Sequence, residues 1–341
     1  MITLFNNPKK EINLSKFIGR GGRFLILKEV KKKNIDCQVI MTKREDKEDL
    51  LYIRLKKGGK TRWISPQRGY FNSKLSCELA LYKDLTYQVL RSINLPVPNS
   101  VKIERLKQLK DLSLSYPLVV KPTAQAKGKD VLVGLEDEVE LRKICKKLLK
   151  KYSSLLVEEF IHGNDFRLLI LDNKLLAAVE RIPPKVKGDG KKTIEKLIEI
   201  SNTKRHDEPE SFRPFLKTLE IDSEIRRCLR KQGFNLKSIL PEGKVIKVRQ
   251  NANFATGGRV EDITDKVHPD NIKLARRAVK ALGLKLGGVD IITKDITQSI
   301  RKNHGKILEV NGIPGLWIHH FPNRGKGKNI ARRIINYLFE N

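Results

Sequence analysis

The chain contains little cysteine, few aromatic residues and no long apolar run. Its four cysteines lie far apart in 341 residues and form no Cys-x-x-Cys pair. We therefore expect neither a disulfide framework nor a zinc site, and a reducing cytoplasm fits best. No stretch of about 18 or more apolar residues is present, so no membrane-spanning segment is expected. The N-terminal stretch MITLFNNPKKEINLSK also lacks the basic-then-apolar order of a secretory signal.

Acidic residues are scarce relative to basic ones. The 39 Asp and Glu residues oppose 70 Lys and Arg residues, which gives a formal net charge of +31. One interpretation is nucleic-acid binding; the other is that lysine is spread along the whole chain. We favour the second and do not expect a nucleic-acid partner, because no basic run is interleaved with aromatic residues that could stack on bases. The positive field should still favour anionic ligands.

The length allows a large core with two or three subdomains. Short strands are predicted at 24–27 and 37–41 around a basic helical stretch, followed by a hairpin with arms at 50–56 and 60–65. Apolar residues at helical spacing predict one helix over 74–93. These elements indicate a small N-terminal α/β lobe.

Beyond residue 93 the pattern alternates between strands and helices. Strands are predicted within 116–135 (two, joined by a polar loop), at 155–161, 166–171, 175–181 and 244–249, with a Pro/Gly/Lys loop at 182–192 and helices at 136–152, 193–201, 222–233, 268–282 and 327–339.

Two short apolar runs near the C-terminal end place carboxylates at or beside strands. Asp290 lies in VDIIT (289–293), and Glu309 lies in LEVNGIPG (308–315), two residues before Asn311. Residues i and i+2 of a strand point to the same face, so Glu309 and Asn311 project together, and Asp290 can join them if the two strands are neighbours. Two carboxylates and an amide carbonyl form an oxygen set of the kind that Mg²⁺ prefers, usually together with substrate phosphates. The trio indicates a metal–nucleotide site.

A loop of small and basic residues follows Lys121, which ends an apolar strand. This loop, 124–129, contains Gly128, and such loops can surround phosphates with backbone N–H groups and cations. A lysine at a strand end is also often an ordinary surface residue, so the pattern alone is weak.

The strand that ends in Glu158 and Glu159 is followed by a turn at Gly163. Its backbone groups could bind the edge of a purine, and a carboxylate suits ribose hydroxyls. An ordinary strand with a charged edge explains the same pattern, and we favour that explanation on this observation alone.

The segment RQNANFATGG (249–258) combines an arginine, two asparagines and two glycines. Arg249 offers a bidentate fork for a carboxylate or phosphate, and Gly257 and Gly258 let a ligand approach the backbone closely. The alternative is a glycine-rich turn between strands. The position of this segment, before a helix and the two carboxylate strands, favours the functional interpretation.

Taken in chain order, these motifs resemble those of the ATP-grasp superfamily, and within it those of the ATP-grasp portion of cyanophycin synthetases. The resemblance covers roughly residues 75–320. Its segments are YKDLTYQVLRSINLPVP (82–98), LVVKP (118–122), LVEEFIHGNDFR (156–167), AAVERIPPKVKGDGKKTIEKLIE (177–199), VRQNANFATGG (248–258), DITDKVHPDN (262–271), GVDIIT (288–293) and LEVNGIPG (308–315). Segments 177–199 and 248–271 are specific to the cyanophycin-synthetase-like branch and its relatives in glutathione-type synthesis.

The resemblance implies a role for each matching residue. ATP would be bound by Lys83, Lys121 and Gly128 at the phosphates, by Glu158, Glu159 and Ile161 at the adenine, and by Asp165 at the ribose. Mg²⁺, with Mn²⁺ as an alternative, would be held by Asp290, Glu309 and Asn311. The transferred phosphoryl group and the acyl intermediate would face Arg167, Arg249, Asn251, Gly257 and Gly258.

The resemblance also implies an α+β ATP-grasp fold, in which two α+β lobes clasp ATP. We expect a small N-terminal α/β lobe over residues 1–75 and an ATP-grasp domain over 76–341. Within that domain, about 115–185 would form the smaller ATP-clasping subdomain and about 186–341 the C-terminal subdomain with the metal site.

Two departures from the family pattern stand out. The loop after Pro122 reads TAQAKGKDV, with Asp130 at a common glycine position, so the loop departs from the family's usual glycine-rich phosphate loop. Cyanophycin synthetases also continue into a second, Mur-ligase-like domain, for which this chain has no room. We therefore expect a single ligation rather than polymerisation.

The function implied is that of an ATP- and Mg²⁺-dependent carboxylate–amine ligase, which forms a peptide or isopeptide bond through an acyl phosphate. Its partners would be small acids and amines, such as amino acids or short, acidic peptides, and it could form a homo-oligomer. Two alternatives remain: an ATP-binding regulator with reduced turnover, and a basic nucleic-acid-associated protein.

Overall fold

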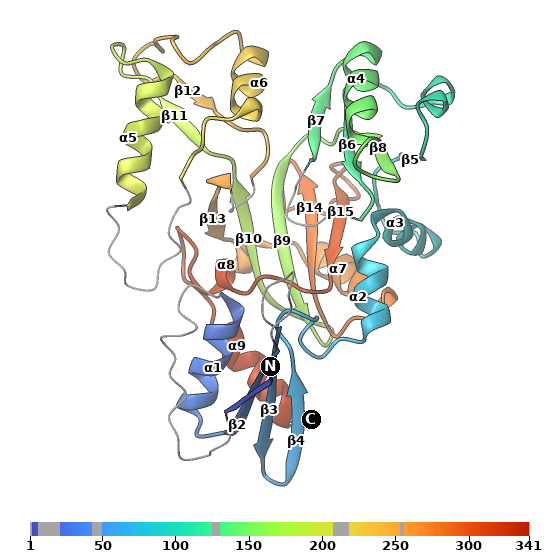
Figure 1. The fold of residues 1–341 in the computed structure, drawn as a ribbon, viewed down its shortest axis with the longest axis vertical. Helices are drawn as coiled ribbons and strands as arrows, with labels where there is room; N and C mark the ends of the chain where they lie inside the picture. Colours follow the sequence, from blue (N-terminus) through green and yellow to red (C-terminus); the bar gives the residue numbers. More distant parts are fainter. Residues whose placement is uncertain are drawn as a thin grey trace.

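The computed structural model describes residues 2–5, 21–42, 50–124, 130–206, 218–252 and 256–340. It is a mixed α+β structure in which every pairing of strands is antiparallel, apart from one isolated bridge. Figure 1 shows a central sheet, with the N-terminal elements at one end of the molecule and two further α+β units at the other.

The N-terminal unit is a four-stranded sheet with one helix. Its strands, in sheet order, are β1 (Ile2–Phe5), β2 (Asp36–Thr42), β3 (Leu50–Lys57) and β4 (Lys60–Ile64), and its helix is α1 (Gly22–Lys32). The predicted strand at 37–41 and the hairpin are confirmed. The predicted strand at 24–27 is wrong, because these four apolar residues lie in α1. All four are buried in a cluster that includes the C-terminal helix α9 (Ile330–Glu340).

This shared cluster joins elements from the two ends of the chain, and Figure 1 shows α9 beside α1. Helix α9 packs on α1, and the same cluster takes in Leu169 and Leu286 of the central sheet. The N-terminal unit therefore has no core of its own, and the boundary proposed at residue 75 remains a prediction.

The helix predicted over 74–93 is broken in two. Helix α2 (Lys74–Leu81) ends at Tyr82, whose φ of −86° and ψ of 107° are extended, and α3 (Lys83–Ser92) begins at once. The backbone N–H of Lys83 donates to the carbonyl of Thr123 (3.0 Å) instead of continuing the α2 ladder. Apolar spacing on both sides of the break is helical, so periodicity alone could not show it. The break places Lys83 at the start of α3, where it is buried.

A second four-stranded sheet lies on one side of the central sheet. In sheet order its strands are β5 (Ser100–Ile103), β8 (Leu155–Glu159), β6 (Leu118–Pro122) and β7 (Leu132–Leu135), covered by α4 (Glu138–Leu148). Helix α4 and three of these strands were predicted, and the four-residue strand β5 was missed. The sheet and α4 share a compact cluster of their own.

The central sheet has five strands. In sheet order they are β13 (Arg259–Asp262), β10 (Lys174–Ile182), β9 (Asn164–Leu171), β14 (Leu286–Thr293) and β15 (Lys306–Asn311). Helices α2, α3 and α7 (Pro269–Ala281) pack in one cluster with one face of the sheet. The strands predicted at 166–171 and 175–181 are confirmed as β9 and β10, which form a hairpin. The two carboxylate strands are neighbours, which is the condition for Asp290 to join Glu309 and Asn311. The subdomain boundary expected at about residue 185 stays a prediction; β9 and β10, which precede it, lie in one sheet with β14 and β15.

A third unit extends from the end of β10. It consists of β11 (Lys185–Lys187), α5 (Ile194–His206), α6 (Ser223–Lys231) and β12 (Val245–Lys247) around a separate cluster. The segment 182–192 was predicted as a loop but contains the short strand β11, which pairs with β12. A short helix that was not predicted, α8 (Trp317–His320), follows the central sheet.

The join between the second sheet and the central sheet requires glycine at residue 163. Its φ is +155°, and a Cβ there would lie 2.5 Å from the carbonyl of Thr293 on β14. This close approach turns the chain directly from β8 into β9, so that residues at the end of one sheet meet those at the edge of the other.

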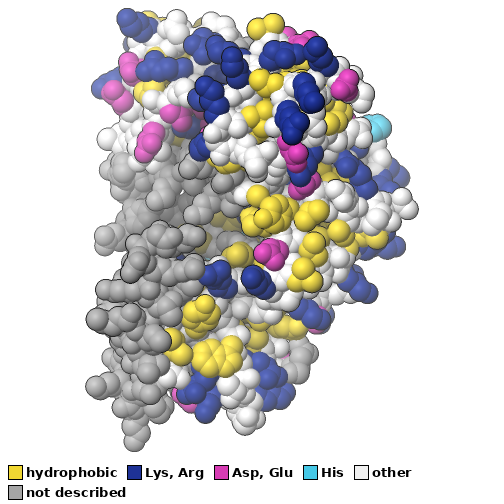
Figure 2. Space-filling model, turned by 45° about the vertical axis from the view of Figure 1, so that its right-hand side comes forward, with side chains coloured by type: hydrophobic (Ala, Val, Ile, Leu, Met, Phe, Trp, Pro, Cys, Tyr) yellow, Lys and Arg dark blue, Asp and Glu magenta, His cyan; other side chains and the backbone are white. Residues whose placement is uncertain are grey.

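The surface carries its positive charge broadly. Figure 2 shows Lys and Arg side chains over the described part of one face, interspersed with apolar and some acidic side chains. Within the described residues, no helix is both long enough and apolar enough to cross a bilayer.

Candidate active site

Three charged side chains form a row across the central sheet. Arg167 on β9 pairs in register with Asp290 on β14, and Asp290 pairs with Glu309 on β15. The Arg167 guanidinium donates two parallel bonds to the Asp290 carboxylate, Nε to Oδ1 at 2.6 Å and Nη2 to Oδ2 at 2.7 Å. Cross-strand neighbours share a sheet face, so the predicted catalytic arginine and the two predicted metal carboxylates lie together.

Arg181 on β10 joins this row and was not among the predicted site residues. Its Nη2 donates to Asp165 Oδ1 at 2.5 Å and to Asp290 Oδ2 at 2.8 Å. Asp165, which the resemblance assigned to the ribose, is thus held in an ion pair beside the carboxylate row. The turn alone would not have shown this, because regular pairing from the hairpin turn would put Glu180 opposite Asp165. A β-bulge between Leu175 and Ala177 shifts the register by one residue and brings Arg181 opposite Asp165, on the face of Arg167.

Asn311 completes the predicted trio. Its amide lies between two members of the row. In the amide orientation that satisfies both neighbours, Nδ2 donates to Glu309 Oε1 (3.1 Å) and Oδ1 accepts from Arg167 Nη2 (2.9 Å). Asn311 pairs with Gly288, two residues before Asp290, so the three side chains share the face that strand alternation predicted.

Charge controls the ionisation of this cluster. Burial alone raises the pKa of Asp290, but the charges of Arg167 and Arg181 outweigh it and hold the pKa below its ordinary value. Burial lowers the pKa of Lys83; the negative charge of Glu309 opposes this shift, and the positive charge of Lys121 adds to it. Lys83 therefore lies within electrostatic reach of both the carboxylate row and Lys121.

Lys121 lies in a second polar cluster, on the two central strands of the second sheet, β6 and β8. Its Nζ is 2.8 Å from Glu158 Oε1 and donates to the hydroxyl of Tyr87 at 3.0 Å. Lys121 and Glu158 are 5% and 2% exposed, and Tyr87 is 1% exposed. A buried ion pair is retained only when it is well hydrogen-bonded, and the Tyr87 hydroxyl supplies that support. Tyr87 was not predicted.

Glu159 points away from Glu158, as neighbouring residues of a strand do. Its carboxylate accepts from the backbone N–H of Asn99 (2.9 Å) and the Asn99 amide (3.3 Å). The side chain thus fixes the loop before β5, while Ile161 is half-buried in the link from β8 to β9. The predicted adenine contacts of Glu159 and Ile161 would have to come from the backbone.

Arg249 lies in the third unit rather than in the row. It is buried, and its guanidinium donates to Asp222 (2.7 Å) and Glu224 (2.9 Å), at the start of α6, and to a backbone carbonyl. Asn251 accepts from Thr256 (3.0 Å). The described contacts of Arg249 and Asn251 reach no member of the row on the central sheet, so their predicted role at the phosphoryl group stays a prediction.

The structure describes two of the three glycines that were predicted as site residues. Gly257 and Gly258 are buried, and Gly257 has a φ of +94°, which is the conformation a tight loop requires of glycine. Gly128 lies outside the described residues.

The side-chain oxygens of Asp290, Glu309 and Asn311 suit a hard cation that also binds a second ligand. Among the described residues, no group of three or more His, Cys, Asp and Glu has the arrangement of a metal site. Asp290, Glu309 and Asn311 instead offer two carboxylates and one amide oxygen. Mg²⁺ commonly uses one or two carboxylates and completes its octahedron with waters and substrate phosphates, so these residues fit it.

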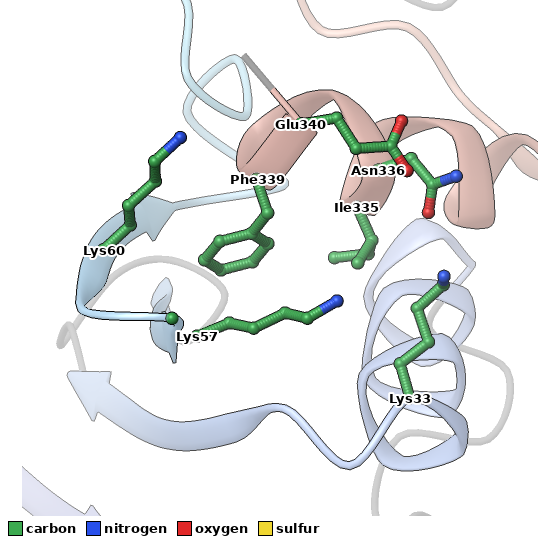
Figure 3. Close-up of a pocket in the computed structure, with 8 residues that line it drawn as sticks. Lys33, Lys57, Lys60, Ile335, Asn336, Phe339 and Glu340 are labelled. Carbon is green, nitrogen blue, oxygen red and sulfur yellow. The ribbon is translucent and has the colours of Figure 1, made fainter.

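A hollow of about 160 Å³ lies elsewhere, between the β3–β4 turn and α9. Figure 3 shows Lys33, Lys57 and Lys60 around Ile335 and Phe339. No predicted site residue lines it, so it is separate from the candidate active site.

His319 on α8 is buried close to the two arginines. It is 1% exposed, and neither ring nitrogen has a hydrogen-bond partner among the described residues. Burial lowers its pKa to about 3, and the charge of Arg167 adds to this shift. His319 is therefore neutral at physiological pH.

We expect His319 to make the stability of the fold sensitive to acid. Because its folded pKa lies below its unfolded value, the unfolded chain binds more protons between about pH 3 and 6.5, and stability falls as the pH drops below about 6.5, by up to ~1.4 kcal/mol per pH unit. Urea midpoints between pH 7.5 and 5 measure the slope. His319→Phe should make it shallower, whereas His162→Gln, at an exposed histidine, should leave it unchanged; equal slopes in all three proteins would contradict this.

Comparison with known proteins identifies the fold. A family described as the RimK-like ATP-grasp domain matches residues 79–194. Cyanophycin synthetase of Crocosphaera subtropica is 34% identical over 295 residues, covering 84% of this chain and 33% of that protein. The glutathione biosynthesis bifunctional protein of Clostridium perfringens is 29% identical over 347 residues, 98% of this chain and 43% of that protein. The crystal structure of a bifunctional glutathione synthetase from Pasteurella multocida matches with a TM-score of 0.62 and 25% identity, over 92% of this chain and 43% of that chain.

The chain carries a RimK-like ATP-grasp domain, and the α+β ATP-grasp fold predicted from its motifs is confirmed. The chain is similar to cyanophycin synthetases over most of its own length. The chain spans about a third of the length of the cyanophycin synthetases that it matches.

Proposed function

We propose that this chain is an ATP- and Mg²⁺-dependent carboxylate–amine ligase that forms a peptide or isopeptide bond through an acyl phosphate. The observation that carries the proposal is the carboxylate row with Arg167 and Arg181 on one sheet face, within electrostatic reach of Lys83 and near the buried Lys121. Phosphoryl transfer is catalysed almost entirely by positioning and charge stabilisation. The site has these elements and needs no catalytic His or Cys.

Each basic residue has a place in the proposed reaction. A substrate carboxylate oxygen attacks the γ-phosphorus and ADP leaves; the amine then attacks the acyl carbon, phosphate leaves, and the amine loses a proton. Lys83 and Lys121 would bind the phosphates of ATP. Arg167 and Arg181 would each redirect some of the hydrogen bonds that they donate to Asp290 toward the transferred phosphoryl group. Bound Mg²⁺ would neutralise phosphate charge, held by Asp290, Glu309 and Asn311.

Charge balance supports binding of the metal together with the nucleotide. Four cations, Lys83, Lys121, Arg167 and Arg181, face the four carboxylates of Glu158, Asp165, Asp290 and Glu309. Adding Mg²⁺ alone would leave this partly buried site with two positive charges that no group pairs, whereas a triphosphate brings anionic oxygens that pair with the metal directly. Unpaired charge in a buried site is costly.

The substrates would be small acids and amines. The positive field and the similarity to proteins named for cyanophycin and glutathione synthesis favour amino acids or short acidic peptides. Arg249 and the loop of Gly257 and Gly258 would reach the acyl intermediate if the third unit closes over the central sheet.

A screen of ADP release would test the function. The protein is incubated with ATP and Mg²⁺, or Mn²⁺, and with pairs drawn from amino acids and short acidic peptides, and products are identified by mass spectrometry. We expect ADP release that depends on both an acid and an amine, with a product equal in mass to the two substrates minus water. Tight ATP binding without ADP release across the panel would instead indicate a regulator with reduced turnover.

A further inference from the structure

The hydroxyl of Tyr87 is a junction of three structural elements. Tyr87 lies on α3 and is 1% exposed. Its oxygen is 3.0 Å from Glu158 Oε2 on β8, 2.9 Å from the Leu308 carbonyl on β15, and 3.0 Å from Lys121 Nζ on β6. One buried atom therefore links the two strands of the Lys121–Glu158 pair to an edge strand of the central sheet.

The Leu308 carbonyl belongs to a β-bulge. Asp290 pairs with Glu309 and Ile291 pairs with Ile307, so Leu308 is the extra residue on β15. A bulge leaves its extra residue outside the regular ladder and re-aims the side chains around it. Here Ile307 and Val310 are three positions apart and both are buried in the same hydrophobic cluster, whereas strict alternation would put them on opposite faces of the sheet. The bulge thus lets Glu309 face the site while both apolar neighbours stay in the core.

We propose that Tyr87 is a positioning residue for the nucleotide site, which holds the Lys121–Glu158 pair against the bulge that precedes Glu309. The inference rests on the proposed function, because it takes Lys121 as a phosphate contact and Glu309 as a metal ligand. Tyr87 itself would touch neither nucleotide nor metal.

The chemistry of the hydroxyl explains why a tyrosine serves here. Lys121 can donate only into the oxygen lone pair, and the single phenolic proton goes to Glu158 or to the Leu308 carbonyl. Burial, and then the charge of Glu158, raise the pKa of Tyr87 well above its ordinary value, so the group remains a neutral donor. The Lys121 ammonium also lies 5.2 Å from the centre of the Tyr87 ring, within the range of a cation–π contact.

Removing only the hydroxyl tests the proposal. Affinity for Mg–ATP is measured by calorimetry without acid or amine substrates, so the measurement does not depend on knowing them. Tyr87→Phe should weaken Mg–ATP binding about tenfold, since a hydrogen bond to a charged group is involved. The matched control is Thr86→Val on the same helix: it removes a hydroxyl that is equally buried but bonded to the Leu79 carbonyl, and it should change the affinity less than twofold.

A double-mutant cycle separates positioning from a general effect on the fold. If Tyr87 acts through the ion pair, Tyr87→Phe should lose most of its effect in a Lys121→Met/Glu158→Gln background, where the hydroxyl keeps its bond to the Leu308 carbonyl but no ion pair is left to position. A purely structural role would give the same tenfold weakening in both backgrounds and overturn the proposal, as would unchanged affinity of Tyr87→Phe itself. If Tyr87→Phe does not give a cooperative thermal melt, the same cycle with Tyr87→His decides, with the same two outcomes.

The same binding measurements distinguish a failure of the proposed function from a failure of the role proposed for Tyr87. If the wild-type protein binds no Mg–ATP, the nucleotide site itself is refuted. If the wild type binds Mg–ATP and Tyr87→Phe binds it equally well, only the role of Tyr87 is refuted.

Discussion

Replacing Asp290 by asparagine is expected to lower ADP release by at least about 100-fold, with any acid–amine pair that the wild-type protein accepts. Losing one group that stabilises charge in a preorganised site typically costs a factor of 10² to 10³, and Asp290 has two such duties. It would hold the metal, and it receives three bonds from Arg167 and Arg181. The amide lacks the negative charge for either.

Two comparisons make this prediction specific. Glu309→Gln should reduce ADP release to a similar degree but lower the melting temperature less, because among the described residues the two arginines form ion pairs with Asp290 and not with Glu309. Asp172→Asn, at the opposite end of β9, removes a carboxylate that is half exposed and 3.8 Å from Lys285; it should leave turnover unchanged. Full turnover in Asp290→Asn or Glu309→Gln would sink the ligase assignment.

The carboxylate row illustrates what sequence alone can give. Asp290, Glu309 and Asn311 lie in two apolar runs, and period-2 alternation predicts a shared face once the strands pair. Pairing itself depends on the rest of the fold, so the sequence could state only the condition. The structure fulfils the condition that the two strands are neighbours, because Asp290 lies opposite Glu309.

The residues missed at the site depend on contacts between distant segments. Tyr87 lies on one stripe of an amphipathic helix, where an aromatic residue usually indicates core packing. Only its position at the seam of two sheets gives its hydroxyl three partners. Nor could local sequence reveal the break at Tyr82, since the hydrogen bond from Lys83 goes to Thr123, forty residues away.

Arg249 differs from these missed residues: the sequence predicted it as a site residue but did not indicate its partners. Its neighbours Asp222 and Glu224 cap and begin α6, about 25 residues earlier in the chain. Three bonds fix Arg249 in the third unit. Any contact between this arginine and the acyl intermediate would require that unit to approach the central sheet, or the arginine to leave its carboxylates.

Lys121→Met is expected to weaken Mg–ATP binding by at least about 30-fold and to destabilise the fold as well. Lys121 would contribute a charge-assisted contact to phosphate, and its loss leaves Glu158 buried without its cation. Breaking such a pair on one side costs about 3–5 kcal/mol of stability. A loss of binding in the single variant would therefore have two explanations, one functional and one structural, and calorimetry alone would not separate them.

The double variant Lys121→Met/Glu158→Gln separates them. It removes both charges, and the glutamine can still accept from Tyr87, so most of the free energy of unfolding should return in urea titrations while Mg–ATP binding stays weak. Lys143→Met, at an exposed lysine of α4, is the control for loss of one positive charge and should change neither quantity. Recovery of wild-type affinity in the double variant would mean that Lys121 only neutralises Glu158, and the phosphate contact would then have to be assigned to Lys83.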